Sequence, residues 1–213
     1  MVFLSNELWF PDPGESTDDG LIAIGGDMSP ERLLLAYRNG IFPWFRKEGY
    51  PFWFCPEERM VLFPNELHVS RSMKKVMRSG RFQVTEDRAF EEVIRACAEV
   101  HEQIDFDTWI DDEFIRAYTQ LHHLGYAHSI EVWEEEKLVG GMYGISIGKI
   151  FCGESMFSRA SNTSKMALIH VCESKRYTLI DCQVPTPHLA SMGARLVSRD
   201  AFLKMIKMYG QST

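Results

Sequence analysis

Long hydrophobic runs are absent from this sequence of 213 residues. No apolar stretch approaches the roughly 18 residues that a membrane-spanning helix requires, so we do not expect a transmembrane segment. The first ten residues contain no basic cluster and are interrupted by Asn6 and Glu7, which argues against a signal peptide. These absences favour a protein that works in the cytoplasm without a membrane partner.

Closely paired cysteines are also absent. The five cysteines are scattered, and no two of them have the CxxC spacing: Cys55, Cys97, Cys152, Cys172 and Cys182. The pattern fits reduced thiols better than a disulfide framework, and it lacks the ligand pairs of a zinc site. The histidines, including His122 and His123, have no ligand spacing either, so we predict no metal and no cofactor.

Acidic residues are missing from one stretch of an otherwise acidic chain. The formal net charge is −7, yet residues 67–85 contain no Asp or Glu and five Lys or Arg residues. The rest of the chain therefore sums to −12 (−7 minus 5). This basic segment on an acidic body predicts one confined site for a polyanion and excludes indiscriminate nucleic-acid binding.

The same segment has the pattern of an amphipathic helix over residues 70–80. Its cations fall at i, i+3, i+4 and i+7 and share one face: Arg71, Lys74, Lys75 and Arg78. Its apolar residues form the opposite, buried stripe: Met73, Val76 and Met77.

Hydrophobic periodicity indicates an α+β chain. An irregular start precedes a helix with Ser29 as N-cap, and residues 41–54 are rich in aromatic residues. Pro43 and Pro51 argue against a regular helix or a central strand there. Further helices are expected at 88–100, 112–123, 162–174, 187–193 and 199–208. Strands are expected at 127–133, 138–147, 149–157, 178–184 and 194–197, the first three as an antiparallel meander. We place a division near residue 65, between an aromatic-rich domain (1–65) and a second domain (66–213).

Five strings are more specific than any of these patterns. They are LIAIGGDMSPERLLLAYRNGIFPWF (21–45), LHVSRSMKK (67–75), GYAHSIEVWEEEKLVGGMYG (125–144), FCGESMFSR (151–159) and DCQVPTPHLASMGA (181–194). Together they resemble the leucyl/phenylalanyl-tRNA–protein transferase family over about residues 20–208. The resemblance implies a small N-terminal domain and a GNAT-like C-terminal domain. It also implies transfer of Leu or Phe, and less readily Met, from aminoacyl-tRNA to the N-terminal Arg or Lys of proteins, which marks them for N-end-rule degradation.

An aminoacyl-tRNA is an activated ester, so this reaction needs no ATP, metal or enzyme nucleophile. It requires the amine to be held against the ester, a proton to be removed and the oxyanion to be stabilised. The resemblance implies that Asp181 and Gln183 lie at the reacting centre, and strand alternation predicts that both side chains share a face. We assign the proton-accepting role to Asp181 and a positioning role to Gln183, and expect Asp181→Asn to fold normally without transfer activity. The alternative is that Asp181 only caps a strand or helix.

The resemblance also implies an apolar aminoacyl pocket, whose residues are Trp44, Trp109, Met142, Phe151, Glu154 and Met156. Ordinary core packing is the alternative role for both tryptophans. Phe151 and Glu154 are three residues apart and cannot share a face of a regular strand, so we predict a bulge at Gly153. Glu154 either orients the substrate amine or contacts the basic acceptor, and the sequence leaves both roles open.

Three cations of the 70–80 helix, Arg71, Lys75 and Arg78, match family positions that contact the tRNA acceptor end. A merely solvated helix face is the alternative. Two positions depart from the family pattern, because Val171 replaces a bulky aromatic residue and Thr186 replaces an Asn.

Two other functions can be weighed against the transferase. A CoA-dependent N-acetyltransferase is disfavoured because the turn Ser158–Ser164 contains no glycine to receive a pyrophosphate. A non-enzymatic RNA-binding module leaves the DCQ strand and the aromatic residues unexplained.

Overall fold

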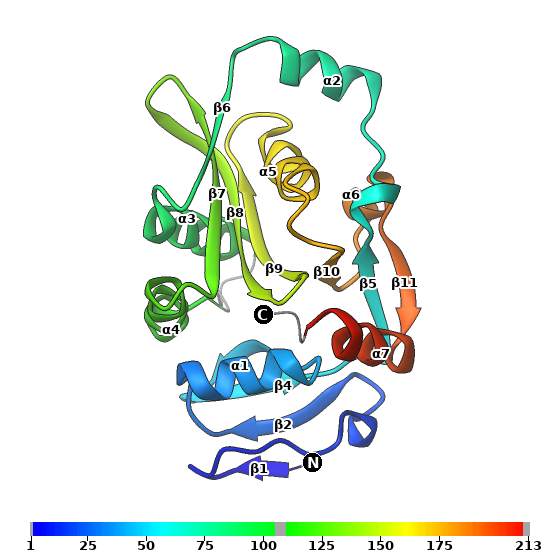
Figure 1. Cartoon of the computed structure of the whole chain (residues 1–213). Coiled ribbons are helices and arrows are strands. Elements are labelled where there is room, and N and C mark those ends of the chain that lie inside the picture. Colours follow the sequence, from blue (N-terminus) through cyan, green and yellow to red (C-terminus); the bar gives the residue numbers. More distant parts are fainter. Residues whose placement is uncertain (1, 105–109, 211–213) are drawn as a thin grey trace.

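Two β-sheets organise the chain, which is described here by a computed structural model covering residues 2–104 and 110–210. A four-stranded sheet lies at the bottom of Figure 1, and a seven-stranded sheet rises above it. The strand orders are β1-β2-β4-β3 and β11-β5-β10-β9-β8-β7-β6. The α+β prediction is therefore confirmed.

The small sheet contains β1 (Val2–Leu4), β2 (Leu21–Gly25), β3 (Phe42–Lys47) and β4 (Tyr50–Phe54). The prediction that prolines exclude a central strand was wrong, because β4 pairs with β2 on one side and β3 on the other. Pro43 lies in the edge strand β3. Pro51 in β4 lies beyond the residues that pair with β2, which are 52–54 on the β4 side. Neither proline interrupts a ladder that needs its missing N–H.

Helix α1 (Pro30–Arg38) packs against this sheet and begins as predicted, since the Ser29 hydroxyl accepts a hydrogen bond from the Arg32 N–H. A short 3₁₀ turn, η1 (Pro13–Glu15), lies between β1 and β2, and a second, η2 (Pro64–Glu66), follows the strand at Glu58–Leu62. The helix ends at Arg38 with Asn39 as its C-cap, and the glycine that follows, Gly40, has a φ of +73°. A left-handed residue of this kind favours glycine, which explains the sharp end of α1.

The predicted meander forms the middle of the large sheet. It consists of β7 (Ala127–Glu134), β8 (Lys137–Ile147) and β9 (Ile150–Ser158), paired antiparallel in chain order. Helix α5 (Thr163–Glu173) follows, and β10 (Leu179–Gln183) then returns parallel to β9. This order of meander, helix and strand is the one expected for the C-terminal domain.

Two strands of the large sheet, β5 and β6, had no sequence prediction, whereas the strand expected at 194–197 is present as β11. β6 (Gln83–Glu86) forms one edge and β5 (Glu58–Leu62) inserts between β10 and β11 (Arg195–Ser198). Because β5 lies before residue 65 but belongs to the large sheet, a division at residue 65 would separate β5 from the other strands of its sheet. The two-domain boundary near residue 65 remains a proposal.

Helices cover both faces of the large sheet (Figure 1). α3 (Phe90–Ile104) and α4 (Asp112–His123) pack on one face, and α5 packs on the other. Successive residues of β8 therefore enter different cores, with Tyr143 beside α3 and α4 and Met142 on the α5 side. Two short elements, α6 (Pro187–Ser191) and α7 (Arg199–Tyr209), flank β11, and α2 (Arg71–Arg78) extends beyond the upper end of the sheet.

No helix in the described parts of the chain combines the length and the apolar character needed to cross a membrane. The buried apolar side chains form two hydrophobic cores.

Candidate active site

A cavity of about 450 Å³ lies where the small sheet, the large sheet and α5 and α6 meet. Its lining is mostly apolar, but two carboxylates and a carboxamide face it. The lining residues used below are Phe42, Trp44, Met142, Glu154, Met156, Leu168, Asp181, Gln183, Thr186 and His188. An apolar pocket with few polar groups is the usual form of a small-ligand site.

Strand β9 is irregular where it reaches this cavity. Tyr143 of β8 pairs with Ser155 and the next residue, Gly144, pairs with Gly153, so Glu154 is the extra residue of a β-bulge. A bulge was predicted at Gly153, and the structure has it with the neighbouring Glu154 as the extra residue. Because a bulge turns its extra residue out of the regular alternation, it directs Glu154 into the cavity.

Glu154 is held by two hydrogen bonds inside an almost dry environment. It is 8% exposed. Gln183 Nε2 donates to its Oε1 over 2.8 Å, and the Tyr118 hydroxyl donates to its Oε2 over 3.2 Å. Burial raises the pKa of Glu154 to about 8, and the nearby charge of Asp181 adds to this rise. A carboxyl group with such a pKa can exchange a proton near neutral pH.

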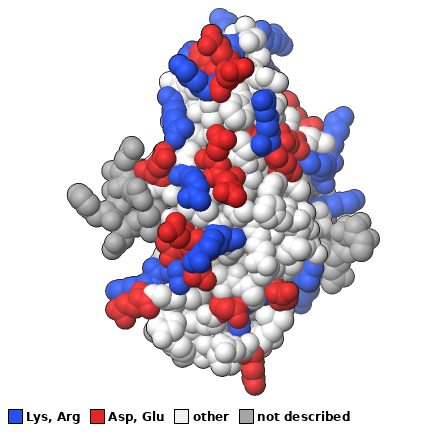
Figure 2. Space-filling model, turned by 90° about the vertical axis from the view of Figure 1, so that its left-hand side faces the viewer, with Lys and Arg blue, Asp and Glu red and all other residues white. Residues whose placement is uncertain are grey.

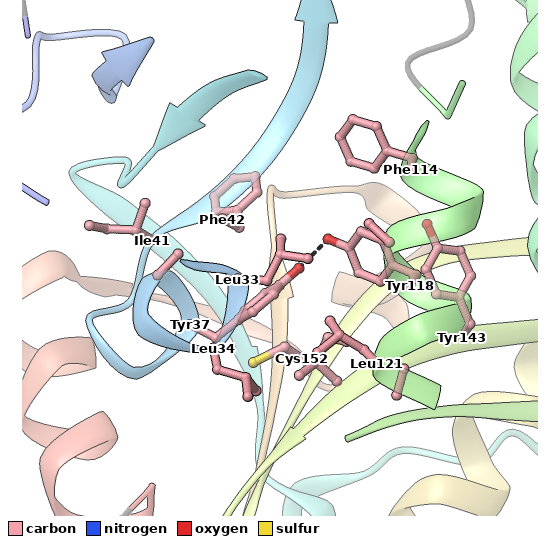
Figure 3. Close-up of a cluster of buried hydrophobic side chains, with 14 of the residues drawn as sticks. Leu33, Leu34, Tyr37, Ile41, Phe42, Phe114, Tyr118, Leu121, Tyr143 and Cys152 are labelled. Atoms are coloured by element: carbon pink, nitrogen blue, oxygen red, sulfur yellow. Dashed lines mark hydrogen bonds between the residues drawn. The ribbon is translucent and has the colours of Figure 1, made fainter. Parts of the chain in front are cut away.

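Behind Glu154 lies a pair of buried tyrosines from different parts of the fold. The hydroxyls of Tyr37 in α1 and Tyr118 in α4 form a hydrogen bond of 2.5 Å (Figure 3). Both rings are surrounded by apolar side chains such as Leu33 and Leu121. Burial raises the pKa of each phenol well above its usual value, so both remain neutral donors. The groups that donate to Glu154 are therefore neutral. Among the described residues, no cation forms an ion pair with it.

Strand β10 is also irregular at its cavity end. Asp181 pairs with Val61 of β5, whereas Gln183 pairs with Met60, so Cys182 is the extra residue of a second bulge. Gln183 has a φ of +59°, a left-handed conformation that is uncommon for a residue with a side chain. Both Asp181 and Gln183 line the cavity, as strand alternation predicted. The backbone between them is not a regular strand, however, because it contains this bulge and the left-handed residue Gln183.

Asp181 is engaged on both carboxylate oxygens and has no exposed surface. Arg59 Nε donates to Oδ1 over 2.8 Å and Arg59 Nη2 donates to Oδ2 over 2.7 Å. Oδ1 also accepts the backbone N–H of Gln183 over 2.9 Å. Charge-assisted hydrogen bonds of this bidentate kind are short and strong, so they fix the orientation of the Asp181 carboxylate.

The structure brings together most of the predicted site residues. Trp44, Met142, Glu154 and Met156 line the cavity with Asp181 and Gln183. Phe151 is fully buried in the core against Tyr177 and, among the described residues, is not one of those lining the cavity. Trp109 lies outside the described residues.

The two departures from the family pattern lie in different places. Val171 is fully buried in α5 and does not appear in the lining formed by the described residues. Thr186 does line the cavity, and its hydroxyl accepts a hydrogen bond from the Leu189 N–H at the start of α6. The side chain at 186 therefore serves the helix as well as the cavity wall.

Several site residues escaped the sequence reasoning. Arg59 comes from an unpredicted strand, Tyr37 and Tyr118 come from helices to which no site role was given, and His188 is one of the histidines without ligand spacing. Each becomes visible only through contacts between distant segments. The LLLAYRNG and RMVL strings contain Tyr37 and Arg59, but spacing within them carries no chemical signal.

The predicted tRNA-binding residues lie on α2, away from the cavity. The side chains of Arg71, Lys75 and Arg78 are exposed together with Lys74, and Met73 is buried beneath them. Within residues 2–104 and 110–210, none of these four cations forms an ion pair. The face at the left of Figure 1 differs, because cations and anions are interspersed over it in Figure 2. Paired cations elsewhere in the chain include Arg116, which pairs with Glu113, and Arg159, which pairs with Glu99.

The fold and the cavity define a class of protein before any relative is considered. An α+β chain with a mostly apolar cavity, a carboxyl group with a raised pKa and a buried ion pair has the features of an enzyme that positions and deprotonates its substrate.

Comparison with known sequences defines the family. Residues 61–207 match the profile of leucyl/phenylalanyl-tRNA protein transferase, and residues 26–57 match the profile of its N-terminal domain. The leucyl/phenylalanyl-tRNA–protein transferase of Syntrophobacter fumaroxidans is 52% identical over 206 residues, which is 95% of this chain and 88% of that protein. The one from Flavobacterium psychrophilum is 52% identical over 211 residues, covering 97% and 100%. The chain belongs to the leucyl/phenylalanyl-tRNA–protein transferase family.

Similar solved structures are far more distant in sequence. FemX is 12% identical with a TM-score of 0.49, covering 84% of this chain and 71% of that one. A GCN5-related N-acetyltransferase from Kribbella flavida is 11% identical with a TM-score of 0.38, covering 78% and 60%. The family assignment rests on the sequence relatives.

Proposed function

We propose that this protein is an aminoacyltransferase that moves Leu or Phe, and less readily Met, from aminoacyl-tRNA to the N-terminal Arg or Lys of proteins. The observation that carries the proposal is the contact between Gln183 and Glu154 inside an otherwise apolar cavity. Such a site can hold an apolar side chain while it handles the proton of an amine. We place the reaction in the cytoplasm, where charged tRNA is available.

The reaction itself is aminolysis of an ester. The lone pair of the acceptor's α-amino nitrogen attacks the ester carbonyl carbon, a peptide bond forms, and the bond to the ribose oxygen breaks. One amine proton must leave, and the ribose oxygen must gain one. Because the donor is already activated, binding and proton transfer are the tasks left to the protein.

Glu154 is the group best suited to the proton transfer. Its pKa of about 8 is close to the value of about 8 for a free α-amino group. A proton can therefore pass between amine and carboxylate with little free-energy cost at neutral pH. The sequence analysis gave this role to Asp181, but we now assign it to Glu154, because the Arg59 cation pairs with both oxygens of Asp181, whereas the donors that contact Glu154 are the neutral Gln183 and Tyr118. In this proposal Asp181 supplies a fixed negative charge and Gln183 positions the reacting groups.

The cavity also fits the proposed donors. Trp44, Met142 and Met156 form apolar walls for an unbranched Cβ with a bulky end. A methylene in such a pocket contributes about 1–3 kcal/mol of discrimination, so shape alone can separate Leu and Phe from smaller residues only partly. The chain's negative charge outside 67–85 favours approach of an acceptor that begins with Arg or Lys.

Helix α2 is the proposed contact for tRNA phosphates through Arg71, Lys75 and Arg78. Its exposed, unpaired cations differ from the paired charges elsewhere. Contacts with phosphates supply affinity without sequence readout, which suits an enzyme that accepts several tRNA species.

The decisive experiment incubates the protein with labelled Phe-tRNA and peptides that differ only in beginning with Arg, Lys or Ala. We expect transfer to the Arg and Lys peptides and not to the Ala peptide. Acetyl-CoA replaces Phe-tRNA in a parallel reaction. Absence of transfer from Phe-tRNA, or acetylation in the parallel reaction, would contradict the proposal.

A further inference from the structure

Arg59 is a fully buried arginine that the proposed chemistry does not use. It is 1% exposed and is the second residue of β5, one residue before the strand positions that pair with β10. Burying a guanidinium is costly unless its charge is matched. The cost of burying Arg59 beside the cavity suggests that it has a role there.

The surroundings of Arg59 fix its orientation from three directions. Asp181 takes two of its N–H groups at 2.8 and 2.7 Å. Its guanidinium lies over the ring of Phe42, 4.4 Å from the centroid, and over the ring of Phe202, 4.8 Å from the centroid. Phe42 belongs to the small sheet and Phe202 to α7, so Arg59 joins β10 to two other elements.

The contacts of Asp181 continue into the cavity. Its Oδ1 binds Arg59 Nε and also the backbone N–H of Gln183, whose φ is positive. The Gln183 side chain then donates to Glu154. An unbroken series of hydrogen bonds thus runs from Arg59 through Asp181 and Gln183 to the carboxyl group that we assign to proton transfer.

We propose that Arg59 is a positioning residue: it holds Asp181 as an anion in one orientation and thereby fixes the left-handed turn that points Gln183 at Glu154. The inference rests on the proposed function, since it concerns the geometry of the same reaction. Arg59 itself touches no reacting atom. Its planar guanidinium is required because a lysine ammonium cannot form the bidentate pair or stack between two rings.

The test compares Arg59→Lys with Arg32→Lys. Arg32 is an equally buried arginine, 0% exposed, paired with Asp27 at 3.3 Å in the N-terminal part and absent from the cavity lining. Both variants are checked by circular dichroism and thermal unfolding, and transfer from Phe-tRNA to an Arg-initial peptide is then measured. We expect Arg59→Lys to lower kcat by about 10- to 100-fold, with KM for Phe-tRNA changed less than about threefold, because small misplacements of reacting groups have effects of this size. Arg32→Lys should keep kcat.

A double variant separates positioning from general loosening of the core. If Arg59 acts through Asp181, adding Arg59→Lys to Asp181→Asn should cause no further loss of kcat beyond that of Asp181→Asn alone. Equal kcat losses in the Arg59→Lys and Arg32→Lys variants, or additive losses in the double variant, would overturn the inference. An inactive wild type would instead overturn the proposed function, so the two failures are distinguishable.

A measurement on the unaltered protein keeps the inference testable should the variants not fold. Carbon-13 NMR correlates the side-chain carboxyl of Asp181 with its assigned backbone. The groups that face it are Arg59, Glu154 and the Cys152 thiol. We expect one sharp carboxyl signal from Asp181, because the bidentate pair with Arg59 allows a single orientation. Two exchanging carboxyl signals would show that Arg59 does not hold Asp181 in one orientation.

Discussion

Two groups of cations in this molecule have opposite surroundings. Arg59 is buried, bidentately paired and stacked between two aromatic rings. Arg71, Lys75 and Arg78 on α2 are exposed on one helix face that no acid interrupts. A buried pair contributes fixed geometry, and removal of either partner leaves a costly charge. Exposed cations contribute affinity that salt weakens. We therefore propose that the buried pair sets the geometry of the cavity and that α2 captures the substrate.

The largest expected effect comes from breaking the buried pair with Asp181→Asn. This variant leaves Arg59 without its anion, so we expect the free energy of unfolding to fall by about 3–5 kcal/mol and transfer to fall at least about 10³-fold. The earlier expectation that it would fold normally did not include Arg59. Urea unfolding and initial rates provide the measurement, with Asp27→Asn as the control on the other buried arginine, whose partner is half exposed. Unchanged stability would remove the pair from the account.

Glu154→Gln is expected to have the next largest effect. An amide cannot accept the proton, so transfer should fall about 100-fold. The pKa of Glu154 is raised in the folded protein to about 8, so the folded state binds more protons than the unfolded state between roughly pH 4 and pH 8. The Glu154 contribution to stability is thus present at low pH and is lost as pH rises through this window, by up to about 1.4 kcal/mol per unit.

Glu154→Gln should lack that pH dependence, which urea unfolding at several pH values can test. The same slope in both proteins would contradict the assignment of the raised pKa to Glu154. The control variant is Glu131→Gln. Glu131 is also a buried carboxylate, but it accepts hydrogen bonds from Thr85 and Ser129 and does not line the cavity.

Neutralising α2 should have a smaller and different effect. The triple variant Arg71→Gln, Lys75→Gln, Arg78→Gln is expected to raise KM for Phe-tRNA roughly tenfold and to reduce the slope of log affinity against log salt by about 2 to 3. The exposed Lys204 and Lys207 of α7, changed to Gln, serve as the control. Filter binding across salt concentrations supplies the readout. A lowered kcat at saturating tRNA would contradict the proposal that α2 contributes to tRNA binding and not to the reaction step.

The smallest expected effect is that of Thr186→Asn. Asn is as good an N-cap as Thr, so the stability of α6 should change by less than about 0.5 kcal/mol. Any change in KM for Phe-tRNA then reports a contact between residue 186 and the substrate, because the side chain lines the cavity. Thr186→Ala, which loses the cap, is the control, and steady-state kinetics with thermal unfolding distinguishes the two effects.

The two regions also differ in how far the sequence predicts them. The α2 face follows from local spacing, since residues three and four apart on a helix are neighbours. Arg59 and Asp181 are 122 positions apart, and the strand that carries Arg59 is short and lies between turns. Only the pairing of β5 with β10 joins them. A bulge next to Glu154 was predicted because Phe151 and Glu154, three residues apart, were both expected in the pocket and cannot share a face of a regular strand. Nothing in the sequence indicated the bulge at Cys182. The family resemblance pointed to Asp181 and Gln183, but their roles depend on contacts that strand alternation does not contain.

The central claim is that the cavity performs the reaction and α2 captures the substrate. Single-turnover transfer from labelled Phe-tRNA at saturating enzyme tests it directly in the wild type, the α2 triple variant and Glu154→Gln. We predict the same rate constant for the α2 variant as for the wild type and a rate constant about 100-fold lower for Glu154→Gln. A slow α2 variant at saturation, or a Glu154→Gln variant as fast as the wild type, would contradict the account.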